Sequence, residues 1–207
     1  MLKLDYTTEE VKLFRKLNSP QKIQDYLNSL KFNFGKDAKF FSPRVVIKTK
    51  KADCLEGAIL AAAILEFHGE KPLIIDLRST AKPFDYDHVV AVFRRYNCFG
   101  AISKTNHGVL RYREPVYKTI RELVMSYFHE YFLDNGHKTL REYSEPLNLS
   151  SIKHINWRTT ESDLWEIHEI LDKAKHYSIL SPQQVKNLRK ADKVEIEAGK
   201  IVVERHN

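Results

Sequence analysis

The chain of 207 residues contains little cysteine, glycine or proline, and it has no long hydrophobic run. Two cysteines cannot form a disulfide framework, and seven glycines and seven prolines are too few for a collagen-like or low-complexity chain. The longest uninterrupted apolar stretch, residues 58–65, is eight residues long, whereas a membrane-spanning helix needs about 20. The first residues also lack the basic and then apolar run of a secretory signal. We therefore expect a soluble protein of the reducing cytoplasm that does not contact a membrane.

Positive charge exceeds negative charge, and the excess is concentrated in one segment. Lysine and arginine number 34 against 27 aspartates and glutamates, which gives a net charge of +7 and a pI near 9.2. Residues 36–51 hold six of the cations and one anion. Such a run is commonly a solvated loop, but this one ends close to Cys54. The cationic segment predicts a preference for acidic substrates or partners.

The N-terminal residues 1–34 are predicted to form two amphipathic helices. The first follows a threonine cap near residue 7, and its apolar side chains recur every three residues. The pair Ser19-Pro20 is typical of an N-cap followed by a proline in the first helical position, and it predicts the second helix. Residues 31–53 are expected to be irregular, apart from a short strand at 45–47.

The centre of the chain is predicted to be a buried helix packed on an antiparallel sheet. Residues 54–67 are apolar on nearly every side, which indicates a helix surrounded by protein, and Asp53 is a good N-cap for it. Cys54 is therefore expected in the first turn of this helix. Apolar runs predict three strands, the second and third forming a hairpin, at 72–77, 88–93 and 99–103.

The C-terminal part, residues 115–207, is predicted to be a helical flank that ends in a hairpin. We see no internal repeat and no linker, so one α+β domain over 1–207, with its Cys/His core at 45–105, is the economical prediction. The flank is expected to contain helices from Pro115 to Leu133, from Glu161 to about Tyr177 and after Ser181-Pro182, with the hairpin at 194–204.

A thiol at the start of a buried helix favours nucleophilic chemistry. Unpaired backbone N–H groups and the helix dipole stabilise a thiolate at Cys54, and Lys50 and Lys51 would add to this if they pointed inward. The same N–H groups can stabilise the oxygen anion that forms when a thiolate attacks an amide. The alternative is that Cys54 is a small hydrophobic core residue.

His88 opens an apolar strand 34 residues after Cys54 and is the candidate base of a Cys–His pair. The alternative is a hydrogen-bonded histidine of the core. In a hairpin with its turn at 95–96, His88 lies opposite Ser103; with the turn at 96–97, the two are diagonal neighbours on the same face. In either register Ser103 can orient the imidazole.

Three stretches resemble the transglutaminase-like superfamily, whose members are related to the papain fold: residues 52–60, 87–92 and 98–103. In this superfamily a cysteine at a helix start, a histidine at a strand start and an aspartate on the adjacent strand form a triad in this order. Cys54 and His88 match it, whereas Ser103 stands where the family usually has aspartate, with Asn106 as another possible partner. The resemblance implies a papain-like α+β core and a cysteine-dependent hydrolase or acyltransferase that acts on amide or peptide bonds without a cofactor.

The missing aspartate leaves alternatives open. Asp85 precedes the strand and is a further candidate partner of His88, whereas Asp87 is expected to point to the opposite face. A neutral partner stabilises an imidazolium less well than an anion does. The first alternative function is therefore a catalytically impaired binding module on the same scaffold.

A second alternative is a basic nucleic-acid-binding protein. The 11 phenylalanines and 10 tyrosines offer stacking faces, and residues 111–113 interleave arginine with tyrosine, but most aromatics recur at a helical spacing typical of a core. Metal and phosphate motifs are also lacking: Cys54 and Cys98 form no Cys-x-x-Cys pair, and no glycine-rich phosphate loop is present. We expect neither a metal nor a cofactor.

Overall fold

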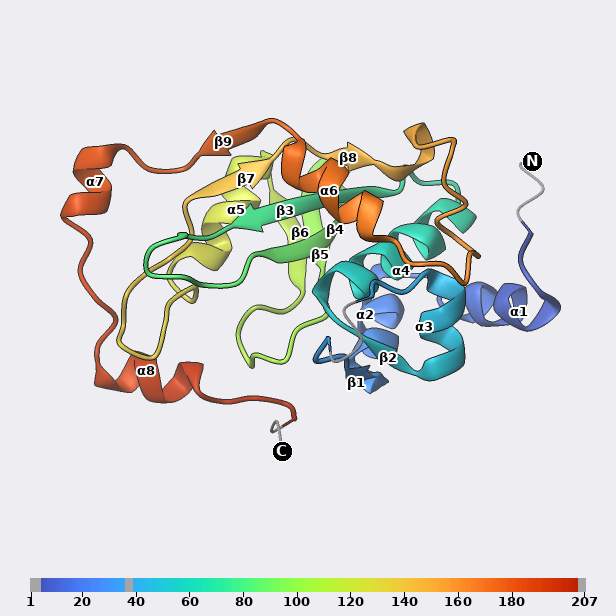
Figure 1. Ribbon diagram of the computed structural model, residues 1–207, viewed down its shortest axis with the longest axis horizontal. Coiled ribbons are helices and arrows are strands. Elements are labelled where there is room, and N and C mark those ends of the chain that lie inside the picture. The colour runs from blue at the N-terminus through green and yellow to red at the C-terminus, as the bar shows by residue number, and fades with distance from the viewer. Residues whose placement is uncertain (1–4, 36–38, 205–207) are drawn as a thin grey trace.

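The structure, a computed structural model, describes residues 5–35 and 39–204 (Figure 1). These residues form a mixed α+β fold in which helices pack on both faces of an antiparallel sheet. The α+β class predicted from the sequence is confirmed. None of the helices in the described ranges is long and apolar enough to cross a membrane.

The main sheet confirms the three predicted strands and adds others to them. In the described residues its order is β6-β5-β4-β3-β7-β9, with β8 also paired to β3. A separate parallel pair joins β1 (Lys31–Phe32) to β2 (Lys51–Ala52) just before the central helix. The strands of the main sheet are β3 (Leu73–Arg78), β4 (His88–Arg95), β5 (Cys98–Ile102), β6 (Arg113–Tyr117), β7 (Glu142–Ser144), β8 (Leu147–Asn148) and β9 (His176–Ser178).

The predicted hairpin is formed by β4 and β5, with residues 96–97 in its turn. Both turn residues have positive φ, 52° and 61°, as in the tight turns whose twist matches that of the strands. Ala91 pairs with Ile102. Of the two registers considered above, this is the one that makes His88 and Ser103 diagonal neighbours on the same face.

The predicted buried helix is α4 (Cys54–Phe67). The Asp53 carboxylate accepts the N–H of Glu56 at 2.8 Å, and the Glu56 carboxylate accepts the N–H of Asp53 at 2.7 Å. Residues 58–65 are at most 2% exposed, because a helix that is apolar on every side must be enclosed by protein. Gly69 ends the helical segment with a φ of 89°.

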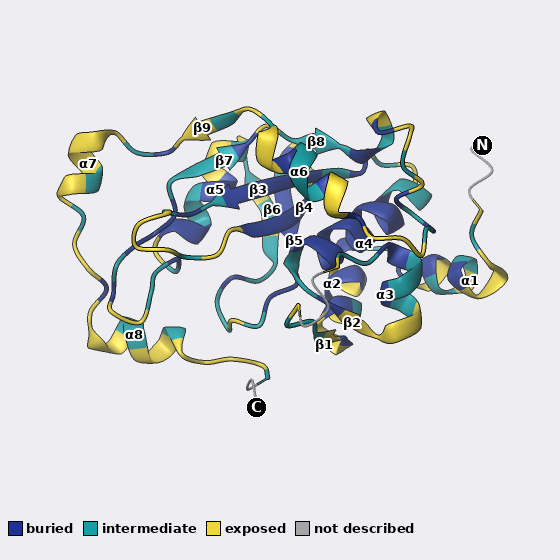
Figure 2. Cartoon of the chain, in the orientation of Figure 1, coloured by how far each residue is buried: buried dark blue, intermediate teal, exposed yellow. Residues whose placement is uncertain are grey.

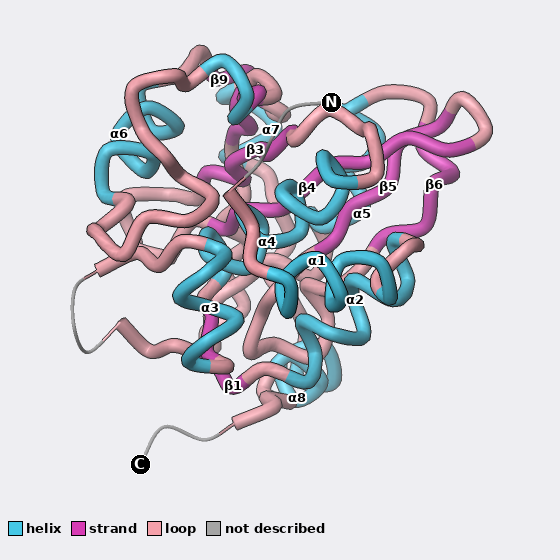
Figure 3. Tube along the Cα trace, turned by 90° about the vertical axis from the view of Figure 1, so that its right-hand side faces the viewer, coloured by secondary structure: helices cyan, strands magenta, loops and turns pink. Residues whose placement is uncertain are grey.

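The two predicted N-terminal helices are confirmed as α1 (Thr8–Lys16) and α2 (Pro20–Ser29). The strand predicted at 45–47 is wrong, because these residues belong to α3 (Pro43–Thr49). Ser42 caps α3 and is followed by a proline in the first helical position, the same signal that starts α2. This cap outweighs the β-propensity of Val-Val-Ile. The three helices lie beside α4 (Figure 3).

The helix predicted from Pro115 to Leu133 exists, but it is shorter at both ends. Pro115 lies in β6, at the edge of the sheet, and α5 (Ile120–Phe128) begins only after its cap Thr119. A proline has no N–H to donate, and an edge strand tolerates it because one side of that strand has no partner. The edge position comes from the sheet order, which the local sequence does not encode.

The terminal hairpin predicted at 194–204 is also wrong. A helix, α8 (Lys193–Gly199), forms there because the side chains of Asp192 and Glu195 each accept the backbone N–H of the other. This capping box outweighs the alternation of apolar residues with glutamate. The helix predicted from residue 161 to 177 forms as α6 (Trp165–Lys173), which is shorter than predicted. The helix predicted after Ser181-Pro182 is confirmed as α7 (Pro182–Lys186).

Hydrophobic cores lie on both faces of the sheet. On one face α4 packs with Val89 and Ala91 of β4, and on the other α5 packs with Val90 and Val92 of the same strand. This alternation follows the two-residue period of a strand. Figure 2 shows α4 and the central strands buried, whereas α7 and α8 at the edge of the molecule are largely exposed.

Candidate functional site

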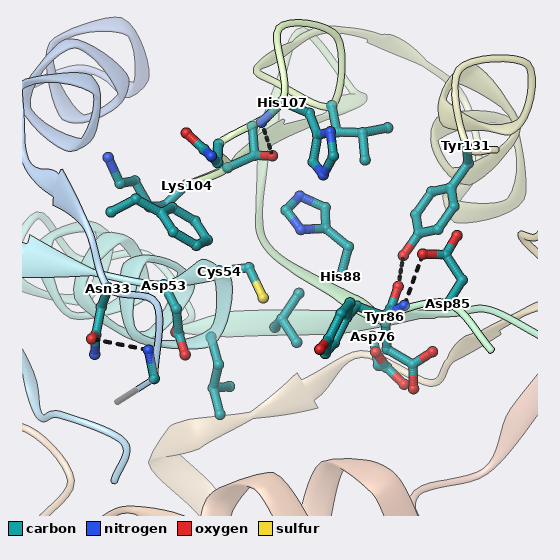
Figure 4. A pocket seen from close by; sticks show the side chains of 18 of the residues that line it. Asn33, Asp53, Cys54, Asp76, Asp85, Tyr86, His88, Lys104, His107 and Tyr131 are labelled. Carbon is teal, nitrogen blue, oxygen red and sulfur yellow. Dashed lines mark hydrogen bonds between the residues drawn. The ribbon is translucent and has the colours of Figure 1, made fainter. Parts of the chain in front are cut away.

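A cavity of about 820 Å³ opens where α4 and β4 begin. Cys54 and His88 both line it, and each is the first residue of its element. In Figure 4 the sulfur of Cys54 is directed into this cavity, and the ring of His88 lies between Cys54 and His107. The structure thus brings two of the predicted residues, distant in sequence, to one cavity.

His88 is held by a chain of hydrogen bonds that ends on a backbone carbonyl. Its Nε2 lies 2.8 Å from Oγ of Ser103, and that hydroxyl donates to the carbonyl of Leu110 at 2.8 Å. A hydroxyl has one proton, and the carbonyl can only accept, so the Ser103 proton points to Leu110. Nε2 must therefore carry a proton and donate it to Ser103, which leaves the lone pair of the ring on Nδ1.

The backbone of Ser103 is fixed from α2. Gln24 donates its amide N–H to the Ser103 carbonyl at 2.8 Å and accepts the Ser103 N–H at 2.9 Å. Gln24 is 5% exposed and Ser103 is fully buried. The Gln24 side chain replaces the strand partner that β5 lacks at this point, so the hydroxyl that holds His88 is itself held rigidly.

Cys54 and His88 reach the cavity from opposite faces of the sheet. His88 shares a face with Val90 and Val92, and its ring centroid lies 6.5 Å from that of Tyr127 in α5. The helix of Cys54 packs on the other face. Both nevertheless line the same cavity, because each is the first residue of its element. In the described part of the chain no hydrogen bond joins the sulfur to the ring.

Burial makes both groups neutral in the free protein. It raises the pKa of the Cys54 thiol to about 12, and the charges of Asp53 and Asp76 contribute to the rise. Burial also lowers the pKa of the His88 imidazole to about 3, and the nearby His107 acts in the same direction. At neutral pH the cavity therefore contains a thiol and an uncharged imidazole.

The predicted resting thiolate is therefore wrong. The N–H of Leu55 lowers the pKa of the thiol, as expected at a helix start, and so does the N–H of Val89 in β4, but the cost of burying a negative charge exceeds their effect. The lysines expected to assist do not point inward. Lys50 and Lys51 are both exposed, and the Lys50 ammonium donates to the hydroxyl of Tyr26 at 3.0 Å.

The other predicted partners of the imidazole have different roles. Asn106 lines the cavity but binds the C-terminal segment, donating to the Glu204 carbonyl at 2.8 Å and accepting its N–H at 2.9 Å. Asp85 accepts the hydroxyl of Thr139 at 2.5 Å, so it is not the partner of His88. Asp87 accepts the N–H of Ser79 at 2.7 Å, and no hydrogen bond joins it to the imidazole among the described residues.

Several residues of the site were missed. Gln24 and the Leu110 carbonyl act through side chain to backbone contacts that no spacing in the sequence reveals. Glu56 is fully buried and, besides capping α4, accepts the N–H of Phe41 at 2.9 Å and the amide of Asn33 at 3.0 Å, which fixes the loop over the helix start. The pattern Asp-x-x-Glu at 53–56 was the available signal for Glu56.

The cations of the segment 36–51 lie away from the cavity wherever the structure describes them. Arg44 forms an ion pair with Glu10 at 2.9 Å, and the exposed cations Lys39, Lys48, Lys50 and Lys51 do not line the cavity. Residues 36–38 lie outside the described residues. The preference for acidic substrates stays a prediction.

The interleaved residues 111–113 make internal contacts. Arg113 forms an ion pair with Glu130 at 2.5 Å, and Tyr112 stacks on Phe93 with ring centroids 5.8 Å apart. Within the described residues, no group of three or more histidine, cysteine, aspartate or glutamate side chains is placed to hold a metal ion.

Comparison with known proteins adds no family: no protein-family model matches the chain, and no curated protein matches it. The residues and geometry of the cavity are therefore the basis for assigning a function.

Proposed function

We propose that the cavity is the active site of a cysteine-dependent hydrolase or acyltransferase that acts on amide or peptide bonds, on a papain-like core of transglutaminase type. One observation carries the proposal. A neutral imidazole, oriented by Ser103 so that its basic nitrogen is Nδ1, shares a cavity with the thiol at the start of α4. Thiol, base and orienting group are the minimal set for acyl transfer through a covalent intermediate.

Because both groups are neutral at rest, proton transfer accompanies the attack. The Cys54 sulfur forms a bond to the substrate carbonyl carbon while its proton moves to Nδ1 of His88. The imidazolium then gives that proton to the leaving nitrogen as the C–N bond breaks, which leaves a thioester and a neutral ring. Water or an amine attacks the thioester, its proton passes through Nδ1, and the thiol is restored.

The helix start also supplies stabilisation for the oxygen anion. Of the N–H groups in the first turn, that of Glu56 is taken by the Asp53 carboxylate. The N–H of Cys54 has no partner among the described residues and lies next to the sulfur. A single such donor aimed at the developing charge is worth about 3 to 4 kcal/mol in barrier height.

The serine also favours a second candidate, a binding module that has lost activity. Ser103 holds the ring but contributes no negative charge to the imidazolium, and a buried imidazole with a pKa of about 3 takes up a proton reluctantly. The same cavity would then bind a peptide without cleaving it. The two candidates differ in whether Cys54 becomes acylated.

The test uses 4-nitrophenyl acetate, whose ester is activated enough to report a weak nucleophile. We expect rapid release of nitrophenolate with one acetyl group on Cys54, located by peptide mass spectrometry, followed by slower turnover as the thioester hydrolyses. Cys98→Ala is the matched control, since Cys98 is buried on β5 and does not line the cavity.

Cys54→Ala should abolish both phases, and His88→Gln should slow acetylation by about 100-fold. Acetylation that is spread over surface lysines and unchanged in Cys54→Ala would overturn the enzyme proposal and leave the binding module.

A further inference from the structure

The wall of the cavity is rich in negative charge near the sulfur. The described lining residues include four aspartates: Asp53, Asp76, Asp85 and Asp87. The Cys54 thiol is affected by the charges of Asp53 and Asp76, and the Tyr131 hydroxyl by those of Asp85, Asp87 and Asp76. Asp53 and Asp76 are therefore close to the sulfur, whereas Asp85 and Asp87 lie near Tyr131 in the same cavity.

Part of this charge has no cation to offset it. Asp76 is paired with His176 at 3.1 Å and lies 3.9 Å from Arg78. In contrast, Asp53, Asp85 and Asp87 accept only backbone N–H and hydroxyl groups in the described structure. Such uncompensated carboxylates in a partly enclosed cavity attract a cation more strongly than they would in open water.

The described lining contains one ammonium group, and it is turned away from this space. Lys104 is 2% exposed, and its Nζ donates to the Leu30 carbonyl at 2.5 Å. Figure 4 shows its side chain extending away from Cys54 and the carboxylates. Lys104 is thus not placed to neutralise the carboxylates or to bind an acidic substrate beside the sulfur.

Aromatic rings flank the carboxylates at the mouth of the cavity. Phe84 and Tyr86 line it on either side of Asp85, and they are 64% and 78% exposed. Their rings meet edge to face with centroids 5.0 Å apart, and the Tyr131 hydroxyl holds the loop by donating to the Tyr86 carbonyl at 2.6 Å. An organic cation is attracted both to the faces of aromatic rings and to carboxylates, so the two together favour its binding.

We propose that the cavity selects substrates with a cationic side chain, an alkylammonium or guanidinium group, next to the amide that is attacked. This inference rests on the proposed function, whose substrate class it names. The observations that carry it are the uncompensated carboxylates at Asp53, Asp85 and Asp87 and the exposed rings beside them. It is opposite to the preference for acidic substrates predicted from the segment 36–51.

A bound cation also assists the chemistry. Asp53 and Asp76 oppose the loss of the thiol proton, and a substrate cation placed beside them cancels part of that opposition. The correct substrate therefore helps to activate the sulfur that attacks it, whereas a neutral or acidic one does not.

The test measures binding without catalysis, in the Cys54→Ala protein, by isothermal titration calorimetry. The probes are the methylamides of N-acetyl-lysine, N-acetyl-norleucine and N-acetyl-glutamate, which separate charge from chain length. We expect the lysine probe to bind at least about 10-fold more tightly than the norleucine probe, and the glutamate probe more weakly than either.

Asp87→Asn should remove most of the preference for lysine and leave norleucine binding unchanged. The asparagine oxygen can still accept the Ser79 N–H, so the fold is retained. Asp85→Asn is a second variant of the same kind, and Asp25→Asn, an exposed carboxylate of α2 outside the cavity, is the matched control.

Equal binding of all three probes, or tighter binding of the glutamate probe, would overturn this inference even if Cys54 is acetylated by the ester. Selective lysine binding that is lost in Asp87→Asn supports it even if acetylation fails, so the two proposals can fail separately.

Discussion

At the scale of single residues, the charge state of His88 follows from its surroundings and not from its type. The ring is 5% exposed, and its Nε2 proton is committed to Ser103, whose own proton is committed to a carbonyl. A proton added on Nδ1 would create a buried cation, and no carboxylate of the described residues forms a hydrogen bond with the ring. The imidazole is therefore a base that accepts a proton only when a thiol beside it loses one.

Nuclear magnetic resonance of the ring nitrogens tests this assignment. We predict the Nε2–H tautomer of His88, unchanged from neutral pH down to about pH 4, because burial lowers its pKa to about 3. Since the folded pKa lies below the unfolded value of 6.5, the contribution of His88 to stability is complete above that value. It is lost as pH falls toward 3, at up to about 1.4 kcal/mol per pH unit. A ring that titrates near pH 6.5, or carries its proton on Nδ1, contradicts the assignment.

For single residues, the sequence predicts which side chains lie close together better than it predicts their charge states. The order of Cys54, His88 and Ser103, combined with hairpin pairing, correctly predicts the contact between His88 and Ser103. It does not predict the neutral thiol, because the cost of burying charge depends on every side chain around the sulfur. Nor does it predict Gln24, whose two hydrogen bonds to Ser103 join residues 79 positions apart.

At the scale of elements, local signals and sheet order compete. The N-caps make α3 and α8 helices, although the apolar patterns of both segments favour strands. The sequence contains the signals for these caps, Ser-Pro at the start of α3 and Asp-x-x-Glu at the start of α8. The edge strand β6 could not be predicted from Pro115, because the proline is tolerated only through the absence of a neighbour on one side. The core elements α4, β4 and β5 were predictable because local pattern and tertiary burial agree there.

The contact between α4 and the end of β5 provides a prediction at this scale. A Cβ on Gly57 would lie 2.3 Å from Cβ of Lys104, the residue after Ser103. We expect Gly57→Ala to destabilise the protein by about 1–3 kcal/mol, although alanine favours a helix by about 1 kcal/mol over glycine. Urea unfolding measures the change.

A second substitution supplies the control for this clash. Lys104→Gly removes the atom that the new Cβ would meet, so Gly57→Ala should cost much less stability in the Lys104→Gly protein than in the wild type. If the two changes are simply additive, the close approach of α4 to β5 is not what requires a glycine at this position.

At the scale of the whole molecule, the C-terminal segment closes one side of the cavity. The N–H of Gly108 donates to the Ile201 carbonyl at 2.8 Å, and Val203 donates to the Asn106 carbonyl at 2.9 Å. The Asn106 side chain adds two hydrogen bonds to Glu204, and Gly199 lines the cavity. Few hydrogen bonds therefore hold the segment after α8 in place, and most of them join it to the loop that follows β5.

Asn106→Ala should loosen this segment without unfolding the protein. We predict that the amide of Glu204 exchanges its hydrogen about 10-fold faster, since its acceptor is removed, while the amides of α4 are unchanged. Hydrogen exchange followed by mass spectrometry or nuclear magnetic resonance measures both regions. Asn135→Ala, which removes a side chain that accepts only within its own loop, is the control. Equal protection of Glu204 in wild type and Asn106→Ala would show that the backbone contacts alone hold the segment.

The pH dependence of Cys54 acetylation by 4-nitrophenyl acetate, compared in wild type and His88→Gln, tests most directly whether thiol and imidazole act as a pair. Between about pH 5 and about pH 9 both groups keep their neutral forms, so the wild-type rate should be nearly constant. In His88→Gln only the thiolate reacts, so the rate should be lower and rise about tenfold per pH unit. A wild-type rate that rises as steeply as that of the variant would contradict the pair and leave Cys54 an ordinary buried thiol.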